Sequence, residues 1–142
     1  MSFPYTGSIK VRFADTDANG HTYFGSYLVL ADEVSSEYWA ELGWDFAELH
    51  EHPYLSFMVN SNIDFVSECL AGDMLSVGVR FSRLGNSSVT LEWEMTKQRT
   101  DNLAAKGTFT SVFVDRSTRR STPVPAVFRE RLLARQPELA AE

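Results

Sequence analysis

The hydrophobic pattern of this chain changes its period near Pro53, and this change constrains the fold more than any other feature. Upstream, apolar residues recur at steps of three and four, as they do on one face of a helix. This stripe comprises Phe24, Tyr27, Leu28, Ala31, Val34, Tyr38 and Leu42. Thr22 is the predicted N-cap and Gly43 the predicted stop. The pattern predicts one amphipathic helix of roughly twenty residues, about 30 Å long.

Downstream of Pro53, apolar and polar residues alternate, which is typical of strands with one buried face. Turn-forming residues such as Gly72-Asp73 separate the segments. The four predicted strands cover residues 57–65, 75–82, 89–96 and 106–114. A shorter alternating run, Ile9 to Phe13, predicts a first strand that ends at Phe13.

A sheet that accompanies a single large helix must wrap around it to bury the apolar stripe. A short final helix is expected to begin around Pro125, because proline suits the first helical turn. We therefore predict an α+β fold in which a five-stranded antiparallel sheet wraps around one long central helix. Residues 1–142 form one domain, since this length supports a single core.

Composition excludes several classes of protein. Hydrophobic residues make up 44% of the chain, yet no apolar run approaches the roughly 18 residues of a membrane span. A net charge of −6 without a Lys/Arg stripe argues against a nucleic-acid partner. The N-terminus has no signal-peptide pattern and Cys69 is the only cysteine, so we expect a cytoplasmic protein.

The stretch Asp15-Thr16-Asp17-Ala18-Asn19-Gly20 resembles the start of a calcium-binding EF-hand loop. Such a loop needs a bidentate Glu at its twelfth position and a helix before it. Here the twelfth residue is Ser26, and the preceding segment has the period of a strand. His50-x-His52 also lacks further ligands at a metal spacing. We therefore expect no metal and no bound cofactor.

Three segments together give the chain a recognisable pattern: "VRFADTDANGHTYFGSYLVLADEV", "NIDFVSECLAGDML" and "AAKGTFTSVFVD" followed by "PVP". The chain resembles the hotdog-fold acyl-CoA thioesterases of the 4-hydroxybenzoyl-CoA thioesterase class, from Val11 to about Pro125. It departs from that family at Glu68, where a proline is common, and we expect this departure to affect only the shape of the local loop. It also departs at Tyr23 and Phe24, where one branch carries two amides after the histidine.

The resemblance implies that Asp17 is the catalytic carboxylate, acting on the thioester of an acyl-CoA or acyl carrier protein. An ionised Asp can attack the carbonyl or deprotonate water. The N–H groups at the start of the following helix can hold the developing oxyanion, and we assign this role to the backbone N–H near Phe24. His21 either orients substrate or moves a proton, although a structural role fits it as well. The predicted substrate-binding residues are Tyr23, Tyr27, Phe57, Val59 and Asn60.

Alternatives to this hypothesis remain open. Acids and amides before a helix are commonly turn and capping residues, and we interpret Asp15 in this way. An enoyl-thioester hydratase on the same fold uses a related Asp, Asn and His, but His21 comes one residue too early for that pattern. A non-catalytic acyl-binding module is the third alternative. Long edge strands predict a homodimer or homotetramer, and the resemblance implies that the site lies between subunits.

Overall fold

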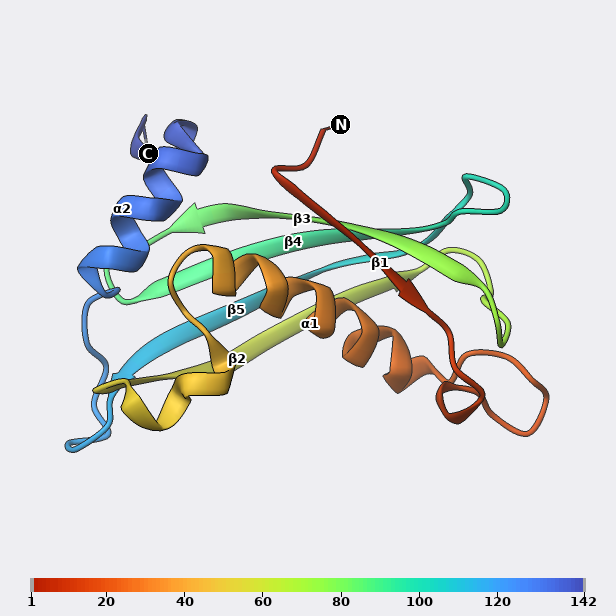
Figure 1. The fold of residues 1–142 in the computed structure, drawn as a ribbon, viewed down its shortest axis with the longest axis horizontal. Helices are drawn as coiled ribbons and strands as arrows, with labels where there is room; N and C mark the ends of the chain where they lie inside the picture. Colours follow the sequence, from red (N-terminus) through yellow and green to blue (C-terminus); the bar gives the residue numbers. More distant parts are fainter. Residues whose placement is uncertain (1, 142) are drawn as a thin grey trace.

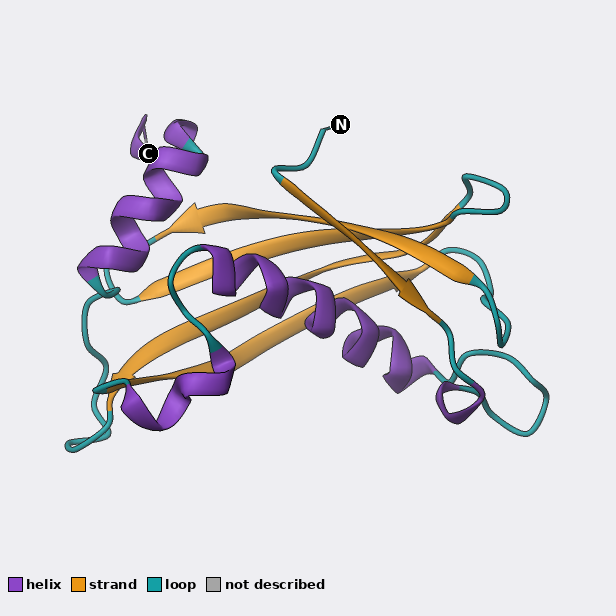
Figure 2. Ribbon diagram, in the orientation of Figure 1, coloured by secondary structure: helices purple, strands orange, loops and turns teal. Residues whose placement is uncertain are grey.

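The computed structural model describes residues 2–141, and in this range it contains a five-stranded antiparallel sheet in the order β1-β3-β4-β5-β2 (Figures 1 and 2). The strands are β1 (Tyr5–Lys10), β2 (Tyr54–Phe65), β3 (Met74–Leu84), β4 (Ser88–Lys97) and β5 (Leu103–Asp115). Every neighbouring pair is antiparallel. The four strands predicted downstream of Pro53 are thus confirmed.

The long helix α1 (Phe24–Glu41) crosses one face of this sheet and packs against β1, β3 and β4 (Figure 1). The second helix, α2 (Ala126–Arg135), follows Pro125 and lies near one end of the sheet. Three short 3₁₀ segments complete the fold: η1 (Phe13–Asp15), η2 (Phe46–Glu51) and η3 (Pro137–Ala141). Within residues 2–141, no helix is both long and apolar enough to cross a membrane.

The core lies between α1 and the inner face of the sheet, and its residues follow the predicted alternation. On β3 and β4 every second residue is buried, from Leu75 to Phe81 and from Val89 to Met95. The helix contributes Tyr27, Ala31, Val34 and Tyr38. Burial of this apolar surface is the main favourable term in folding.

Aromatic rings fill the end of the core near the C-terminus of α1. Trp39 contacts the rings of Phe81, Phe113 and Phe128, with centroids 4.9–5.7 Å apart. This cluster joins α1, the sheet and α2, and interiors packed in this way resist movement of any one ring.

Three details of the predicted elements are wrong. The first strand ends at Lys10, and Phe13 lies in η1 with 87% of its surface exposed. The chain turns there because the Asp15 carboxylate accepts hydrogen bonds from the Arg12 backbone and guanidinium. Phe24 was expected in the buried stripe of α1, but its ring is exposed. Thr22 does not cap the helix; Tyr23 occupies the N-cap position.

The pattern of β2 also differs from its prediction. Residues 57–65 alternate in sequence, which predicts that Phe57 and Ile63 share one face. A bulge between Met58 and Asn60 adds a residue to the strand, so the faces are exchanged there. Ser56 and Met58 consequently face α1, whereas Phe57 points to the other side.

Candidate active site

The turn that carries Asp17 is a small hairpin. An antiparallel bridge joins Thr16 to Thr22, and the Asp17 N–H donates to the His21 carbonyl at 2.8 Å. Gly20 has φ +80°, a conformation that costs little only for glycine. The hairpin returns the chain so that the start of α1 lies beside the turn. The Tyr23 N–H donates to the Asp15 carbonyl at 2.9 Å and fixes this arrangement.

Asp17 is exposed, and one carboxylate oxygen supports the turn. Its Oδ1 accepts from the Asn19 N–H at 2.8 Å and from the His21 N–H at 3.3 Å. Within residues 2–141, no hydrogen bond engages Oδ2. The carboxylate is therefore held in orientation through one oxygen, while the other faces solvent.

Asp15 occupies a different environment, only two residues away. Its side chain is buried, and both oxygens accept hydrogen bonds from the Arg12 guanidinium, at 2.8 and 3.0 Å. The hydrogen bond from Arg12 lowers the pKa of the Asp15 carboxyl, although burial acts in the opposite direction. Both contacts keep Asp15 occupied, which agrees with the structural role expected for it.

The first turn of α1 presents free backbone donors. Tyr23 makes no side-chain cap, and no hydrogen bond of residues 2–141 uses the Phe24 N–H. Unpaired N–H groups and the helix dipole favour negative charge at this point. The Tyr23 ring lies against Gly25, where a Cβ would approach the ring to 2.9 Å. The Tyr23 and Phe24 rings are 4.5 Å apart.

The segment between β2 and β3 ties the turn to the body of the protein. The Thr22 N–H and hydroxyl both donate to the buried Cys69 carbonyl, at 2.8 and 2.9 Å. His21 bridges to Leu70, and its Nε2 lies 3.0 Å from Glu68 Oε2. Glu68, which stands where the resembled family commonly has proline, thus pairs with a candidate catalytic residue. Sequence reasoning predicted an effect of Glu68 on loop shape only.

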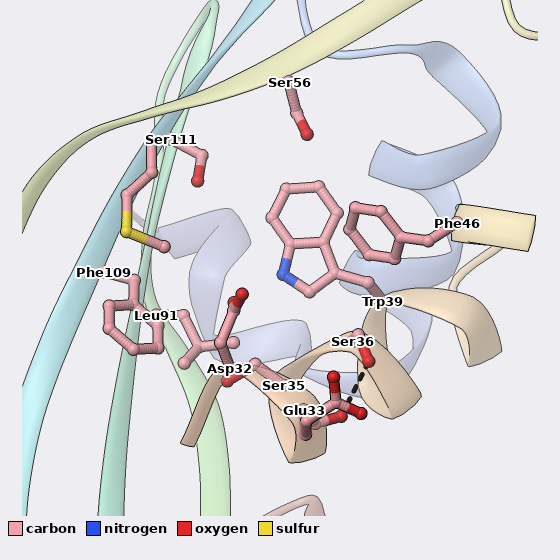
Figure 3. Close-up of a pocket in the computed structure, with 11 residues that line it drawn as sticks. Asp32, Glu33, Ser35, Ser36, Trp39, Phe46, Ser56, Leu91, Phe109 and Ser111 are labelled. Atoms are coloured by element: carbon pink, nitrogen blue, oxygen red, sulfur yellow. Dashed lines mark hydrogen bonds between the residues drawn. The ribbon is translucent and has the colours of Figure 1, made fainter. Parts of the chain in front are cut away.

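A cavity of about 340 Å³ lies further along α1, between that helix, η2 and β2 (Figure 3). Its apolar walls are Trp39, Phe46, Met58, Leu91 and Phe109. Its polar lining comprises Asp32, Glu33, Ser35, Ser36, Ser56 and Ser111. The combination of aromatic walls with a few polar groups is typical of small-molecule sites.

Asp32 projects into this cavity from α1 (Figure 3). Its carboxyl is reached by solvent from the mouth of the cavity. The surrounding protein nevertheless removes part of the water that would solvate the charged form. Burial raises the pKa of Asp32, and the neighbouring charge of Glu33 raises it further. Sequence reasoning missed this residue. The available signal was its position one residue after Ala31 of the buried stripe, at the edge between helix and sheet.

The predicted site residues fall into two groups. Asp17, His21, Tyr23 and Phe24 gather at the turn, and the hydroxyl of the buried Tyr27 accepts from the Cys69 N–H behind it, at 3.2 Å. Phe57, Val59 and Asn60 lie on the exposed edge strand β2.

The two groups are separated within one chain. The end of β2 near the turn is Phe65, whose ring contacts Tyr27 at 5.3 Å. Asn60, Val59 and Phe57 lie five to eight residues further along the strand, which is about 17–26 Å. No cluster of three His, Cys, Asp or Glu side chains suitable for a metal is found among the described residues.

The chain is similar to known proteins over most of its length. The family model described as the thioesterase-like superfamily matches residues 11–132. A 1,4-dihydroxy-2-naphthoyl-CoA hydrolase of Nostoc punctiforme is 28% identical over 126 residues, which cover 88% of this chain and 82% of that protein. The acyl-CoA thioesterase YbgC of Haemophilus influenzae is 28% identical over 98 residues, covering 68% and 69% respectively.

A solved structure extends this similarity to three dimensions. A thioesterase of Thermus thermophilus, complexed with coenzyme A and Zn, matches with a TM-score of 0.80 and 29% identity. The match covers 95% of this chain and 96% of that one.

Proposed function

The chain belongs to the thioesterase-like superfamily, and from this we propose that it is an acyl-CoA thioesterase built on the hotdog fold. It hydrolyses the thioester bond between an acyl group and coenzyme A. The carbonyl carbon of the substrate sits between the Asp17 carboxylate and the first turn of α1. Neither a metal ion nor an organic cofactor takes part.

One observation carries this proposal: the hairpin has a free carboxylate oxygen, and the helix that follows it begins with a free N–H. Asp17 Oδ2 faces solvent, and the Phe24 N–H has no partner among the described residues. A base or nucleophile on one side of a carbonyl and an oxyanion donor on the other are the two parts that acyl transfer needs.

Two routes fit these parts. As a general base, Asp17 takes a proton from water while the water oxygen bonds to the carbonyl carbon. The oxyanion accepts from the Phe24 N–H, and the C–S bond then breaks as the thiolate receives the proton from Asp17. As a nucleophile, Asp17 displaces the thiolate and forms a mixed anhydride, which water hydrolyses to the acid. His21 belongs to the same hairpin as Asp17, and it assists proton transfer by either route.

The acyl group extends along α1 into the cavity that contains Asp32. Phe24 and Asp32 are eight residues apart, which is about 12 Å along the helix axis. This distance suits an extended or aromatic acyl group. The aromatic walls and the polar groups of Asp32, Ser56 and Ser111 favour an aromatic acid that carries hydroxyl groups. The Nostoc relative, named for a dihydroxynaphthoyl substrate, supports this choice.

The complete site forms in a homodimer or homotetramer in the cytoplasm. Within one chain, Phe57, Val59 and Asn60 are distant from Asp17, but β2 is an edge strand open to a second copy. In the oligomer these three residues bind substrate beside the Tyr23 and Tyr27 of the other subunit. The carrier is coenzyme A, as the coenzyme A complex of the Thermus relative supports, and we place it at the surface near this junction.

A hydrolysis screen tests the proposal. The purified protein is incubated with aromatic, short-chain and long-chain acyl-CoA esters, and release of free thiol is measured. We expect turnover with at least one class, highest for hydroxylated aromatic esters. Hydration of crotonyl-CoA without thiol release would instead support the hydratase alternative. Saturable acyl-CoA binding without either reaction would support an acyl-binding module.

A further inference from the structure

Phe46 of η2 lines the acyl cavity beside Trp39, at the C-terminal end of α1. Its ring lies 5.9 Å from that of Trp39, beside the indole (Figure 3). Phe46 is 39% exposed, so part of its ring is in contact with solvent. Phe46 thus borders both the cavity and the exterior, and we take it as the wall between them.

Trp39 gives this wall a fixed support. It is buried in the aromatic cluster described above, where three further rings surround it. A ring packed in this manner has little freedom to move aside when a ligand arrives. Phe46 therefore cannot be displaced inward, and its position depends on the backbone of η2.

That backbone is capped at its start and held on the core at its end. At the start, the Asp45 carboxylate accepts from the Ala47 N–H at 2.9 Å, directly after the Gly43 turn with φ +94°. At the end, the His52 ring stacks on Trp44, with centroids 4.5 Å apart and planes 8° from parallel. Connecting segments of proteins are usually mobile. This one is held on a rigid core.

Arg116 provides a further restraint from the turn after β5. Its guanidinium donates to the His52 carbonyl at 2.8 Å and also to the Leu49 carbonyl. The sequence around it, with Arg119 and Arg120, suggests only a solvated basic turn. Arg116 is instead directed to η2, where it is the donor to the His52 carbonyl and a second donor to the Leu49 carbonyl, which also accepts from the His52 N–H.

We propose that Phe46 sets the maximum length of the acyl group, and that Arg116 is the positioning residue that keeps this wall in place. The proposal rests on the thioesterase function argued above, with the acyl group in the cavity beside Asp32. An acyl chain that reaches Phe46 has no space for a further methylene. In a pocket of fixed size, one excess methylene changes kcat/KM by about 10- to 200-fold.

Two substitutions of Phe46 test the wall in opposite directions. A ladder of straight-chain esters from butanoyl- to dodecanoyl-CoA is assayed by thiol release. We expect Phe46→Ala to move the fall in kcat/KM to longer chains, raising the ratio of long-chain to short-chain activity at least about tenfold. Phe46→Trp should move it to shorter chains. Val127→Ala, on the exposed face of α2, is the control and should leave the profile unchanged.

Arg116→Gln tests the positioning role, with the exposed Arg120→Gln as its control. We expect Arg116→Gln to blunt the chain-length cut-off by lowering KM for long esters, while kcat for the shortest ester is unchanged. A purely structural role would lower the melting temperature and leave the ratio of long-chain to short-chain KM as it was. Such a result would remove Arg116 from the proposal.

A binding measurement separates this inference from the proposed function. Calorimetric titration with the matching free carboxylic acids reports on the cavity even when no thioester is hydrolysed. A shift of the longest bound acid in Phe46→Ala supports the wall, whether or not hydrolysis occurs. An identical chain-length dependence in wild type, Phe46→Ala and Phe46→Trp, by hydrolysis and by binding, would overturn it. Absence of hydrolysis with a shifted binding profile would contradict the thioesterase assignment alone.

Discussion

Asp15 and Asp17 show how two identical residues in one turn acquire different chemistry. Asp15 is buried, and its pKa is lowered by the hydrogen bond from Arg12, so it stabilises the fold above the pKa of an unfolded Asp, about 3.9. That contribution is lost as the pH falls through the lower, folded pKa. Asp17 is exposed and holds the turn through one oxygen. In the sequence, only the family resemblance distinguishes the two residues, because composition and spacing give no reason to assign them different roles.

Replacement of each acid by its amide separates the two roles. Asp17→Asn removes charge and basicity while keeping the shape, so we expect kcat to fall at least about a hundredfold with little change in KM. Asp15→Asn weakens the contact with Arg12, so we expect a loss of about 1–3 kcal/mol in unfolding free energy and a much smaller effect on kcat. Thiol release and thermal melting, compared at matched folded concentration, give the answer. Equal losses of kcat in both variants would return Asp17 to a turn-forming role.

Asp32 should respond to substitution in the opposite sense to Asp15. Burial raises its pKa in the folded protein, so the ionised form is a cost to stability at neutral pH. We expect Asp32→Asn to increase the melting temperature at pH 7. Because the carboxyl is reached by solvent, the gain should stay below about 1 kcal/mol.

The pH dependence provides the check on Asp32. The difference between Asp32→Asn and wild type should shrink as the pH falls and vanish below the pKa of an unfolded Asp, about 3.9, where both forms are neutral. Melting curves from pH 3 to pH 7 measure this difference. A gain that persists at pH 3, or a loss at pH 7, would show that packing, not charge, controls the effect.

At the scale of elements, the sequence was most informative where one face is buried. Apolar residues alternate with others along β3 and β4 because their inner residues meet α1, and hydrophobicity follows that contact. Strand β2 has exposed residues on both sides of its bulge. The hydrophobic pattern therefore could not reveal that its side chains change faces at the bulge. The start of α1 was misassigned for a related reason. The Thr22 hydroxyl donates to the carbonyl of Cys69, 47 residues away. A capping rule that considers only neighbouring residues cannot predict this contact.

The tie between the turn and the segment after β2 yields a prediction about Thr22. Thr22→Val keeps the shape and the N–H bond to the Cys69 carbonyl but removes the hydroxyl bond. We expect a loss of about 1 kcal/mol in unfolding free energy, since a typical hydrogen bond contributes this amount. We also expect a fall in kcat smaller than that of Asp17→Asn, because the turn keeps its hairpin.

Thr90→Val is the matched control for Thr22. It removes a hydroxyl that bonds to Thr110 across the outer face of the sheet, at 3.1 Å, away from the turn. Denaturant unfolding and steady-state kinetics on both variants measure the difference. If kcat fell equally in the two variants, general destabilisation would explain the loss of kcat. The anchoring of the turn by Thr22 would then have no part in it.

At the scale of the whole molecule, the candidate site was only partly predictable. Residues of the turn are contiguous in sequence, so their chemistry could be judged from the pattern around Asp17. The cavity, in contrast, is formed by five elements, α1, η2, β2, β4 and β5, whose proximity exists only in the fold. Phe46, Ser56 and Asp32 are far apart in sequence and carry no shared motif. Such a site becomes visible only when these elements are placed together in the fold.

The free edge of β2 leads to the prediction for the assembly. This strand has 12 residues, and it is the last in the order of the sheet. Phe57 and Val59 are 43% and 60% exposed on it, an apolar edge that a monomer would leave open to aggregation. We expect light scattering at micromolar concentration to give the mass of a dimer or tetramer.

Charges on this edge should break the assembly and the activity together. We expect the double variant Phe57→Lys with Val59→Lys to scatter as a monomer, because lysine on an edge strand opposes pairing. Its kcat/KM should fall at least about tenfold, since these residues no longer complete the site of a second subunit. Val127→Lys, at a comparably exposed position on α2, should change neither mass nor activity. A stable, fully active wild-type monomer would contradict the shared site, because every residue needed for turnover would then come from one chain.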